Sequence, residues 1–347
     1  MHLRTTTRAV ILGAAVASLA FAATPGLAQS PSAGAAAPNP YPLTQGGTLN
    51  IDFATYNPLS LVIRDQQLLE NALAPQGISV NWVQSAGSNK ANEALRAAAI
   101  DVGSTAGSAA LLARSNGSPI QVIDIYSQPE WAALVVPADS TIASVADLRG
   151  KHIAATKGTD PYFFLLQSLQ EAGVPLEEVT IENLQHADGW AALANGSVDA
   201  WAGLDPIMAN AEATAGAKLL YRNVGFNSYG FLNATEAFIN ERPDVAQTVV
   251  DAYEKAREWA LANPDATAAL LAEVASIDPA VAAKVIAERS NLGVDNVPGD
   301  AQRAVLGVIG PIFVGSGDVA SQEQIDAALA SLINPTFATA ADPARIP

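Results

Sequence analysis

Short apolar stretches alternate with amphipathic ones from about residue 48 to residue 224. Residues 48–54 and 78–83 have the apolar patterns of strands, whereas apolar positions within residues 60–73 and 89–99 recur at helical spacing. Repeated strand–helix units are typical of α/β proteins with largely parallel sheets. We therefore predict an α/β fold for this part of the chain.

A break in this alternation predicts two lobes. Residues 121–126 and 131–137 read as consecutive strands with only Gln128-Pro129 between them, which is a natural place for the chain to pass into another lobe. After Asn223 the alternation stops. The most economical arrangement is a first lobe of residues 48–133 plus 232–347 around a second lobe of residues 138–226.

The rest of the chain is predicted to be mostly helical. After a short strand over residues 231–237, three helical stretches each begin with proline, which is tolerated at the first helical position because no N–H is needed there. These helices and a fourth one are predicted over residues 243–263, 264–276, 279–290 and 321–332.

The first residues have the pattern of an export signal. Arg4 and Arg8 give a positive start, residues 9–23 form an apolar run too short to cross a bilayer, and Ala28 completes a small-residue cleavage site. We predict a signal peptide over residues 1–28 and a flexible leader, rich in Pro and Ala, over residues 29–47. A chain without Cys cannot be a lipoprotein, so we expect a soluble, exported protein.

Composition excludes several classes of protein. The formal charge of -16 arises from 18 Lys and Arg against 34 Asp and Glu, which argues against a nucleic-acid partner because phosphate binding needs a basic face. With no Cys and only three His, the sequence lacks the residues for thiolate metal sites or a Cys nucleophile. We predict neither a metal nor another cofactor.

Three turns share one pattern, in which an apolar strand ends, small and hydroxyl residues follow, and a helix begins. Unpaired N–H groups and the positive end of the dipole at a helix start favour small anions, and ligands bind where parallel strands end. Each turn taken alone is more often a plain helix cap. Together they predict an anion site, with the candidates Ser88, Asn89, Thr105, Gly107, Ser108, Gly158, Thr159 and Asp160.

Aromatic and acidic residues near these turns are candidates for the rest of a pocket. Trp201 fits a core position equally well, and Asp205 before Pro206 fits a cap of the following helix. A carboxylate at the far end of the pocket would favour a neutral or amine-bearing ligand tail. These candidates are Tyr56, Asn57, Glu130, Trp131, Trp201 and Asp205.

Five segments carry a resemblance to a known family: residues 56–58, 82–90, 103–120, 144–165 and 197–206. In order and spacing they resemble the aliphatic sulfonate, taurine and nitrate group of ABC-transporter substrate-binding proteins. The resemblance implies a two-lobed type II periplasmic binding protein fold with the ligand cleft between the lobes. It also implies a periplasmic monomer that delivers its ligand to a membrane permease with its ATPase. The turns at Ser88, Thr105, Gly107, Gly158 and Thr159 would then line the anion site.

The resemblance implies a small organic anion as ligand, foremost an aliphatic sulfonate or taurine. A phthalate-like aromatic carboxylate and nitrate stay open as alternatives, since residues 129–131 (Pro-Glu-Trp) depart from many sulfonate binders. We expect no enzymatic activity. The related thiamine-pyrimidine synthases share the implied fold but resemble sequences with a Cys-rich motif, and this chain has no Cys.

The export signal predicts a mature N-terminus at Gln29 when the full chain is produced in a bacterium with a periplasm. Removal of residues 1–28 takes two Arg and no acidic residue with it, so the mature protein should carry a formal charge of -16 - 2 = -18. The intact mass of the periplasmic protein checks the cleavage. A mass that retains residues 1–28 would contradict the prediction.

Overall fold

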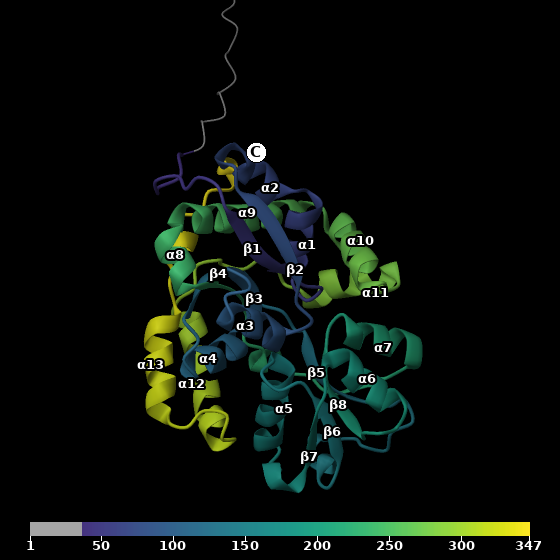
Figure 1. Ribbon diagram of the computed structural model, residues 1–347. Helices are drawn as coiled ribbons and strands as arrows, with labels where there is room; N and C mark the ends of the chain where they lie inside the picture. The colour runs from purple at the N-terminus through teal and green to yellow at the C-terminus, as the bar shows by residue number, and fades with distance from the viewer. Residues whose placement is uncertain (1–36) are drawn as a thin grey trace, which may run out of the picture. The chain divides into compact units, whose positions relative to one another are not determined.

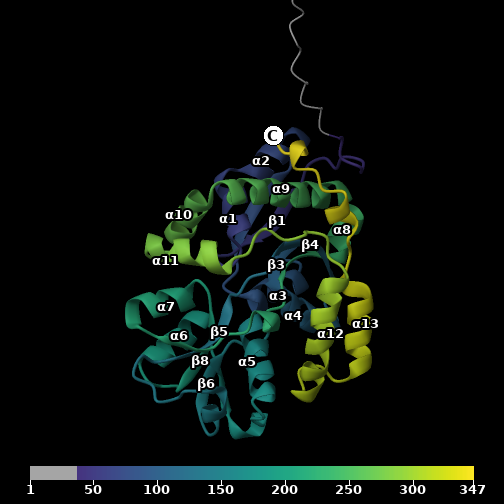
Figure 2. The same ribbon diagram turned by 180° about the vertical axis from the view of Figure 1, so that it is seen from behind.

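The computed structural model describes residues 37–347. The predicted signal peptide and the first part of the predicted leader lie outside the described residues. Within the described part, two five-stranded sheets are covered by helices, as Figures 1 and 2 show. Among the helices of residues 37–347, none is both long and apolar enough to cross a membrane.

The first sheet takes its strands from two distant stretches of sequence. Its strands are β1 (Thr48–Phe53), β2 (Ser79–Gln84), β3 (Val102–Ala106), β4 (Ile120–Ser127) and β10 (Gly230–Thr235). They lie in the order β2-β1-β3-β10-β4. Strand β1 pairs in parallel with β2 and β3, whereas β10 runs antiparallel to β3 and β4.

The second sheet comes from the sequence between β4 and β10. Its strands are β5 (Ala132–Val136), β6 (His152–Ala155), β7 (Thr180–Asn183), β8 (Ala200–Leu204) and β9 (Lys218–Tyr221). They lie in the order β7-β6-β8-β5-β9. Strand β6 pairs in parallel with β7 and β8, whereas β5 runs antiparallel to β8 and β9.

The α/β class is confirmed, but the prediction of largely parallel sheets holds for only half of the strand pairs. In each sheet the strand reached directly from the other sheet, β5 or β10, is antiparallel to both of its neighbours. The crossings at residues 128–131 and 222–229 are short, so each of these strands enters its sheet at the end where the parallel strands finish and runs back against them.

The α-helices of the described part occupy the faces and ends of the sheets. Helices α5, α6 and α7 pack on the second sheet, and α12 and α13 lie side by side (Figures 1 and 2). Their bounds are α1 Pro58–Asp65, α2 Leu68–Leu73, α3 Ser88–Arg96, α4 Gly107–Ser115, α5 Asp160–Glu171, α6 His186–Ala194, α7 Ile207–Ala215, α8 Glu236–Glu241, α9 Pro243–Ala262, α10 Pro264–Ala275, α11 Pro279–Lys284, α12 Asp300–Gly315, α13 Gln322–Leu332 and α14 Thr336–Thr339.

Two helical predictions need correction. The single helix expected over residues 60–73 is two helices, α1 and α2, because Gln67 takes a left-handed conformation with φ 53° between them. Helix α12 was not expected, since Gly and Pro, including Pro311 inside it, hide its periodicity. The helices that begin at Pro243, Pro264 and Pro279 do start at those residues.

The apolar core is continuous between the sheets. One buried cluster contains Ile51 and Val102 of the first sheet together with Leu134 and Ala202 of the second. A separate cluster fills the other face of the second sheet, where α6 and α7 pack. The lobe boundaries stay a prediction.

A third stretch of chain runs along the first crossing. The N–H of Glu130 donates to Arg289 O at 2.8 Å, and the N–H of Gln128 donates to Asn291 O at 3.1 Å. Arg289 ends a π-helical turn, Val285–Arg289, that follows α11. These bonds hold Arg289 next to the crossing at residues 128–131, which joins the two sheets.

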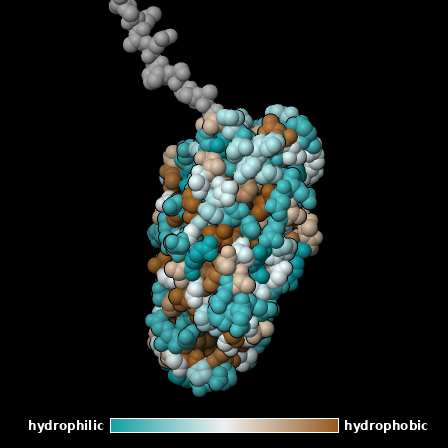
Figure 3. All heavy atoms as spheres, turned by 90° about the vertical axis from the view of Figure 1, so that its left-hand side faces the viewer, coloured by the Kyte–Doolittle hydropathy of each residue, from teal (hydrophilic) through white to brown (hydrophobic). Residues whose placement is uncertain are grey.

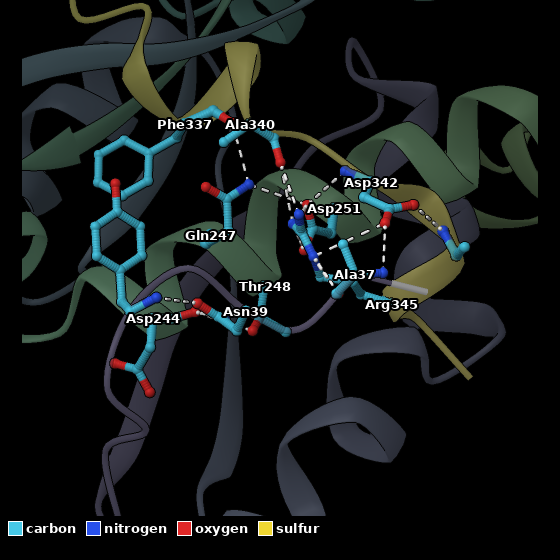
Figure 4. A network of polar contacts seen from close by, with 12 residues as sticks. Ala37, Asn39, Asp244, Gln247, Thr248, Asp251, Phe337, Ala340, Asp342 and Arg345 are labelled. Atoms are coloured by element: carbon cyan, nitrogen blue, oxygen red, sulfur yellow. Dashed lines mark hydrogen bonds and ion pairs between the residues drawn. The ribbon is translucent and has the colours of Figure 1, made fainter. Parts of the chain in front are cut away.

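Part of the leader predicted as flexible over residues 29–47 makes hydrogen bonds to helix α9. Thr44 donates both its N–H and its hydroxyl to the Asp244 carboxylate at 2.6 Å, and Asn39 donates to Asp244 O at 2.9 Å. Next to this contact, Arg345 donates to both carboxylate oxygens of Asp251 at 2.9 Å and to Ala37 O (Figure 4). Helix α9 therefore bonds both residues 39–44 and residues 342–345.

Replacing Asp244 by Ala should lower the free energy of unfolding by about 3 kcal/mol. The change removes two hydrogen bonds to a buried carboxylate, each worth about 1.5–3 kcal/mol, from the first turn of α9. Urea unfolding measures the loss, and proteolysis before Thr44 should become faster.

Asp265→Ala is the matched control, because Asp265 also lies in the first turn of a proline-started helix but is exposed. It should cost no more than about 1 kcal/mol. Equal losses in the two variants would contradict the role given to Asp244.

Candidate functional site

The three predicted turns meet in the structure. The hydroxyl of Ser88, from the first turn, accepts a hydrogen bond from the N–H of Ala106 at 2.9 Å in the second. The hydroxyl of Ser108 donates to Asp160 Oδ1 at 2.6 Å, which joins the second turn to the third. A β-carbon placed on Gly158 would lie 3.6 Å from Asn89 Cβ, so the third turn also faces the first.

Asp160 lies at the centre of this meeting point and is 1% exposed. Its Oδ1 accepts hydrogen bonds from the hydroxyls of Ser108 (2.6 Å) and Ser228 (2.5 Å). Its Oδ2 accepts from Trp131 Nε1 (2.8 Å) and from the N–H of Ser228 (3.0 Å). We call these donors of Ser108, Trp131 and Ser228 the cradle. All four donors are uncharged, and together they have the geometry of an oxyanion site.

Burial raises the pKa of Asp160, and the hydrogen bonds from Ser108, Ser228 and Trp131 oppose that rise. The carboxyl begins α5, where the helix dipole favours a negative charge. A carboxylate with four donors is a satisfied buried anion. The cradle therefore compensates an oxyanion without any positively charged side chain.

Ser228 is a functional candidate that the sequence did not reveal. It lies in the crossing that precedes β10, and no spacing in the sequence relates it to α4. Its carbonyl accepts the N–H of Gly107 at 3.0 Å, and its hydroxyl accepts the N–H of Ser108 at 2.7 Å. A β-carbon at position 107 would lie 2.3 Å from Ser228 O, so only glycine permits this close approach. This contact explains why residue 107 is a glycine.

The remaining hydroxyls of the turns bond within the protein. Thr105 Oγ1 donates to Ala106 O at 2.9 Å and accepts from Asn233 at 2.7 Å. Thr159 Oγ1 donates to Thr156 O at 2.6 Å. Gly158 has φ 78°, the left-handed region that favours glycine. Ligand contacts of Thr105 and Thr159 stay predictions, since a ligand would have to replace these bonds.

Tyr56 and Asn57 lie beside the cradle. The Tyr56 ring packs edge-on against Trp131 with centroids 6.0 Å apart, and its hydroxyl donates to Ser104 O at 3.0 Å. Asn57 caps α1 and donates to the Tyr253 hydroxyl at 3.0 Å. Both side chains are buried and have internal polar partners. They fix the wall of the site behind Trp131.

Beneath this wall, Asp52 is a second buried carboxyl group that the sequence did not single out. It is fully buried at the end of β1, and its Oδ1 accepts from the N–H and hydroxyl of Ser104. Burial raises the pKa of Asp52 to about 7, against the hydrogen bonds from Ser85 and Ser104.

Asp205 is paired and does not face a ligand with a free charge. Both of its carboxylate oxygens accept from Arg289 Nη1 at 3.1 Å, and Oδ1 also accepts the N–H of Ala209 in the first turn of α7. Burial raises the pKa of Asp205 to about 6, against the lowering effect of Arg289. The cap is present as expected, but the carboxylate predicted for the ligand tail is neutralised by an arginine that the sequence did not reveal.

Arg289 also donates to Glu212 of α7 at 2.5 Å, so it bonds two acidic groups next to the second sheet. A cavity of about 10 Å³, lined by Tyr56, Trp131 and Asp205 among others, lies beside it. Arg289 Nε and Ser127 Oγ, both lining residues, are buried and have no partner among the described residues. This cavity has room for about one water molecule.

Two further candidates lie elsewhere. Trp201 is fully buried in the cluster under α6 and α7, with its ring centroid 6.1 Å from that of Trp190, which agrees with the core position left open for it. Glu130 forms a bidentate ion pair with Arg222, at 2.6 and 2.9 Å. This ion pair joins the two crossings between the sheets.

His186 connects the sheets on the other side of the turns. Thr156 Oγ1 donates to Leu184 O, so it must accept from His186 Nδ1–H at 3.2 Å, which leaves Nε2 as a bare acceptor. A β-carbon on Gly87 would lie 3.1 Å from that Nε2. The neutral imidazole of α6 thus packs against the first turn.

A larger apolar groove of about 910 Å³ lies between α5 and α12. Its only charged lining residue is Glu171, which would repel an anion. Figure 3 views the molecule from the side on which α13 lies and shows apolar surface there among hydrophilic areas. The groove has no polar group arranged like the cradle, so we do not assign the anion site to it.

Comparisons with known proteins agree on family and fold. Residues 73–267, more than half of the chain, match the family described as NMT1/THI5 like. A putative aliphatic sulfonates-binding protein of Escherichia coli (strain K12) is 28% identical over 231 residues, 66% of this chain and 72% of that protein. A protein of the same description from Bacillus subtilis (strain 168) is 29% identical over 229 residues, 65% and 69% of the two chains.

Other similar proteins differ in what they are named for. The riboflavin-binding protein RibY of Chloroflexus aurantiacus is 27% identical over 254 residues, 69% of this chain and 68% of that protein. Among solved structures, the alkanesulfonate-binding protein SsuA of Xanthomonas axonopodis pv. citri, bound to MOPS, has a TM-score of 0.75 at 24% identity, covering 82% and 98% of the two chains. The desulfurization enzyme DszB has a TM-score of 0.61 at 16% identity, covering 85% and 98%. These structures show the fold.

Replacing His186 by Asn should reduce the loss of stability in acid. Burial lowers the pKa of His186 to about 3, whereas an unfolded His has a pKa of about 6.5. Between these values the unfolded chain binds more protons, so the free energy of unfolding falls as the pH falls through this window. Asn keeps a polar partner for Thr156 and does not titrate. Urea unfolding at pH 7.5 and 4.5 checks this: an equal fall in both proteins would contradict it.

Proposed function

Because the chain belongs to the NMT1/THI5-like family, we propose that it is the solute-binding component of an ABC importer and captures a small organic anion, foremost an aliphatic sulfonate or taurine. Two relatives carry the name of aliphatic sulfonate binders, and a similar solved structure is an alkanesulfonate-binding protein. Its partners would be a membrane permease with its ATPase, and it would act as a periplasmic monomer.

The observation that carries the proposal is the cradle of Ser108, Trp131 and Ser228. Four uncharged donors converge there on one oxyanion beside the starts of α4 and α5. A sulfonate stays ionised at physiological pH and offers three acceptor oxygens, so it fits a set of converging hydrogen-bond donors. We infer that the anionic head of the ligand binds in this cradle.

The ligand would enter by separation of two lobes. We propose the boundaries 48–133 plus 232–347 for the first lobe and 138–226 for the second, with the crossings as hinges. The bonds of Ser108 to Asp160 and of Arg289 to Asp205 connect residues of the two proposed lobes, and Ser228 bonds to Asp160 from the second crossing. A ligand that contacts both lobes shifts the equilibrium toward the closed form.

We propose a binding protein and not an enzyme. DszB shares the fold, but the chain has no Cys to act as a nucleophile, and His186 is bonded within the protein. Recovery of an incubated sulfonate without loss or new products supports this. The RibY relative and the aromatic Tyr56 and Trp131 keep aromatic ligands as the second candidate class.

A thermal-shift panel tests the ligand class on the purified protein without residues 1–28. It contains ethanesulfonate, taurine, phthalate, nitrate and riboflavin. A bound ligand at 100 times its Kd stabilises by about 2.7 kcal/mol, so ethanesulfonate or taurine should give the largest rise in Tm. A rise only with phthalate, nitrate or riboflavin would contradict the sulfonate assignment. No rise at all would contradict a solute-binding role for these compounds.

Two glycine variants locate the site. Gly107→Ala would put a methyl carbon 2.3 Å from Ser228 O and displace the cradle, so ethanesulfonate should bind about tenfold or more weakly by calorimetry. Gly307→Ala in α12 meets no atom within 4 Å and should bind as the wild type does. Circular dichroism confirms folding of both. Equal affinities in the two variants would place the ligand elsewhere.

A further inference from the structure

The anion site of this protein is filled by one of its own side chains. The Asp160 carboxylate accepts all four hydrogen bonds that the cradle offers, at 2.5 to 3.0 Å, and is 1% exposed. Each cradle donor has Asp160 as its acceptor. The cradle therefore has no free donor for a second anion while Asp160 remains in place.

These bonds also hold the two sheets together. Asp160 begins α5, which packs on the second sheet, and Trp131 precedes β5 of that sheet. Ser108 belongs to α4 beside the first sheet, and Ser228 is bonded to the start of α4. Three of the four bonds to Asp160 thus come from the first-sheet side. Separation of the sheets would break the bond from Ser108 of α4, and it would pull on those from the two crossings, which contain Trp131 and Ser228.

A ligand anion and the Asp160 carboxylate cannot share the cradle. Two negative charges in one buried site repel each other. The four donors of the cradle would also have to be divided between the two anions, so that neither would be fully hydrogen-bonded. The positive charge of Arg289 does not offset the second anion, because its Nη1 and Nη2 are already bonded to the carboxylates of Asp205 and Glu212. One of the two anions must leave.

We propose that Asp160 is a built-in competitor that occupies the anion cradle of the empty protein, and that a ligand anion binds only by displacing it. This inference rests on the proposed function and adds the residue that sets its affinity. Binding then exchanges one set of hydrogen bonds for another. The affinity is lowered by the factor by which Asp160 favours its own bonded state.

The rival reading makes Asp160 a brace that positions Ser108 and Ser228 for the ligand. The two interpretations predict opposite changes in ligand affinity when the Asp160 carboxylate is removed. Without a brace the donors lose their arrangement and the ligand binds more weakly, whereas without a competitor the donors become free and the ligand binds more tightly. Removal of the carboxylate separates them.

Calorimetry with ethanesulfonate on Asp160→Ala is the first test. If the competitor is removed, the affinity should rise about tenfold, the equivalent of one net hydrogen bond. Asp160→Asn keeps the side-chain shape and should give a smaller rise, which preserves the test if the Ala variant does not fold. Asp265→Asn, an exposed first-turn acid in α10, should leave the affinity unchanged. Unchanged or weaker binding in both Asp160 variants would overturn the proposal.

Ser108→Ala in both backgrounds gives a second, independent readout. Ser108 donates to the competitor in the wild type and to the ligand after displacement, so its removal should weaken ethanesulfonate less in the wild type than in Asp160→Ala. In Asp160→Ala the same change should weaken ethanesulfonate about tenfold. Equal effects in the two backgrounds would show that Asp160 and the ligand do not use the same donor.

The outcomes also separate this inference from the proposed function. If ethanesulfonate binds the wild type but no Asp160 variant binds it more tightly, the sulfonate function stands and the competitor is refuted. If neither the wild type nor any variant binds ethanesulfonate, both proposals fail. Scattering of the empty Asp160→Ala protein should also give a larger radius of gyration than the wild type, since three connecting bonds are gone.

Discussion

Contacts between the two sheets converge on a carboxylate that is removed from water, and this burial constrains the residues around it. An ionised group in such a place must receive hydrogen bonds, and Asp160 receives them from Ser108, Trp131 and Ser228. To reach it, Ser228 must lie against the start of α4, which requires glycine at position 107. The register of the crossing before β10 therefore follows from the need to satisfy one acidic side chain.

A second buried carboxylate near the same crossing is stabilised by a charged partner instead of neutral donors. Asp205, which follows β8, is bonded by the guanidinium of Arg289, whose Nη1 donates to both carboxylate oxygens. Arg289 is held beside the first crossing by the bond from Glu130 N to its carbonyl. One acid of the second sheet is thus satisfied by neutral dipoles and the other by a cation. A ligand anion competes more easily for the neutral donors around Asp160 than for Arg289. Breaking the buried ion pair of Asp205 with Arg289 costs more free energy.

The sequence predicted the classes of residue at the site better than their partners. Gly107, Ser108 and Asp160 could be named because strand, small residues and helix start follow one another locally. Ser228 and Arg289 could not, because they reach the site through long-range hydrogen bonds in segments without a local pattern. The strand pattern itself cannot tell which face of the sheet each helix covers, so it leaves Trp201 open between core and pocket, and the structure shows it facing α6 and α7.

The same limit explains which features of the fold could be predicted from the sequence. Alternation of short apolar and amphipathic stretches predicts an α/β class, but it contains no information on the direction in which a strand joins its sheet. Strands β5 and β10 are antiparallel because the chain enters each sheet through a short crossing. The leader gave no periodic signal, and its order comes from Asp244, a residue some two hundred positions later in the chain.

Trp131 is bonded through its indole N–H to the Asp160 carboxylate, while Trp190 and Trp201 pack against each other in a cluster on the other face of the second sheet. The transition dipole of an indole is sensitive to a charge at its N–H. Exchange of the carboxylate for another anion, or its departure, therefore alters the near-ultraviolet spectrum of this one chromophore. The protein contains its own optical label at the place where occupancy changes, and no dye has to be attached to follow it.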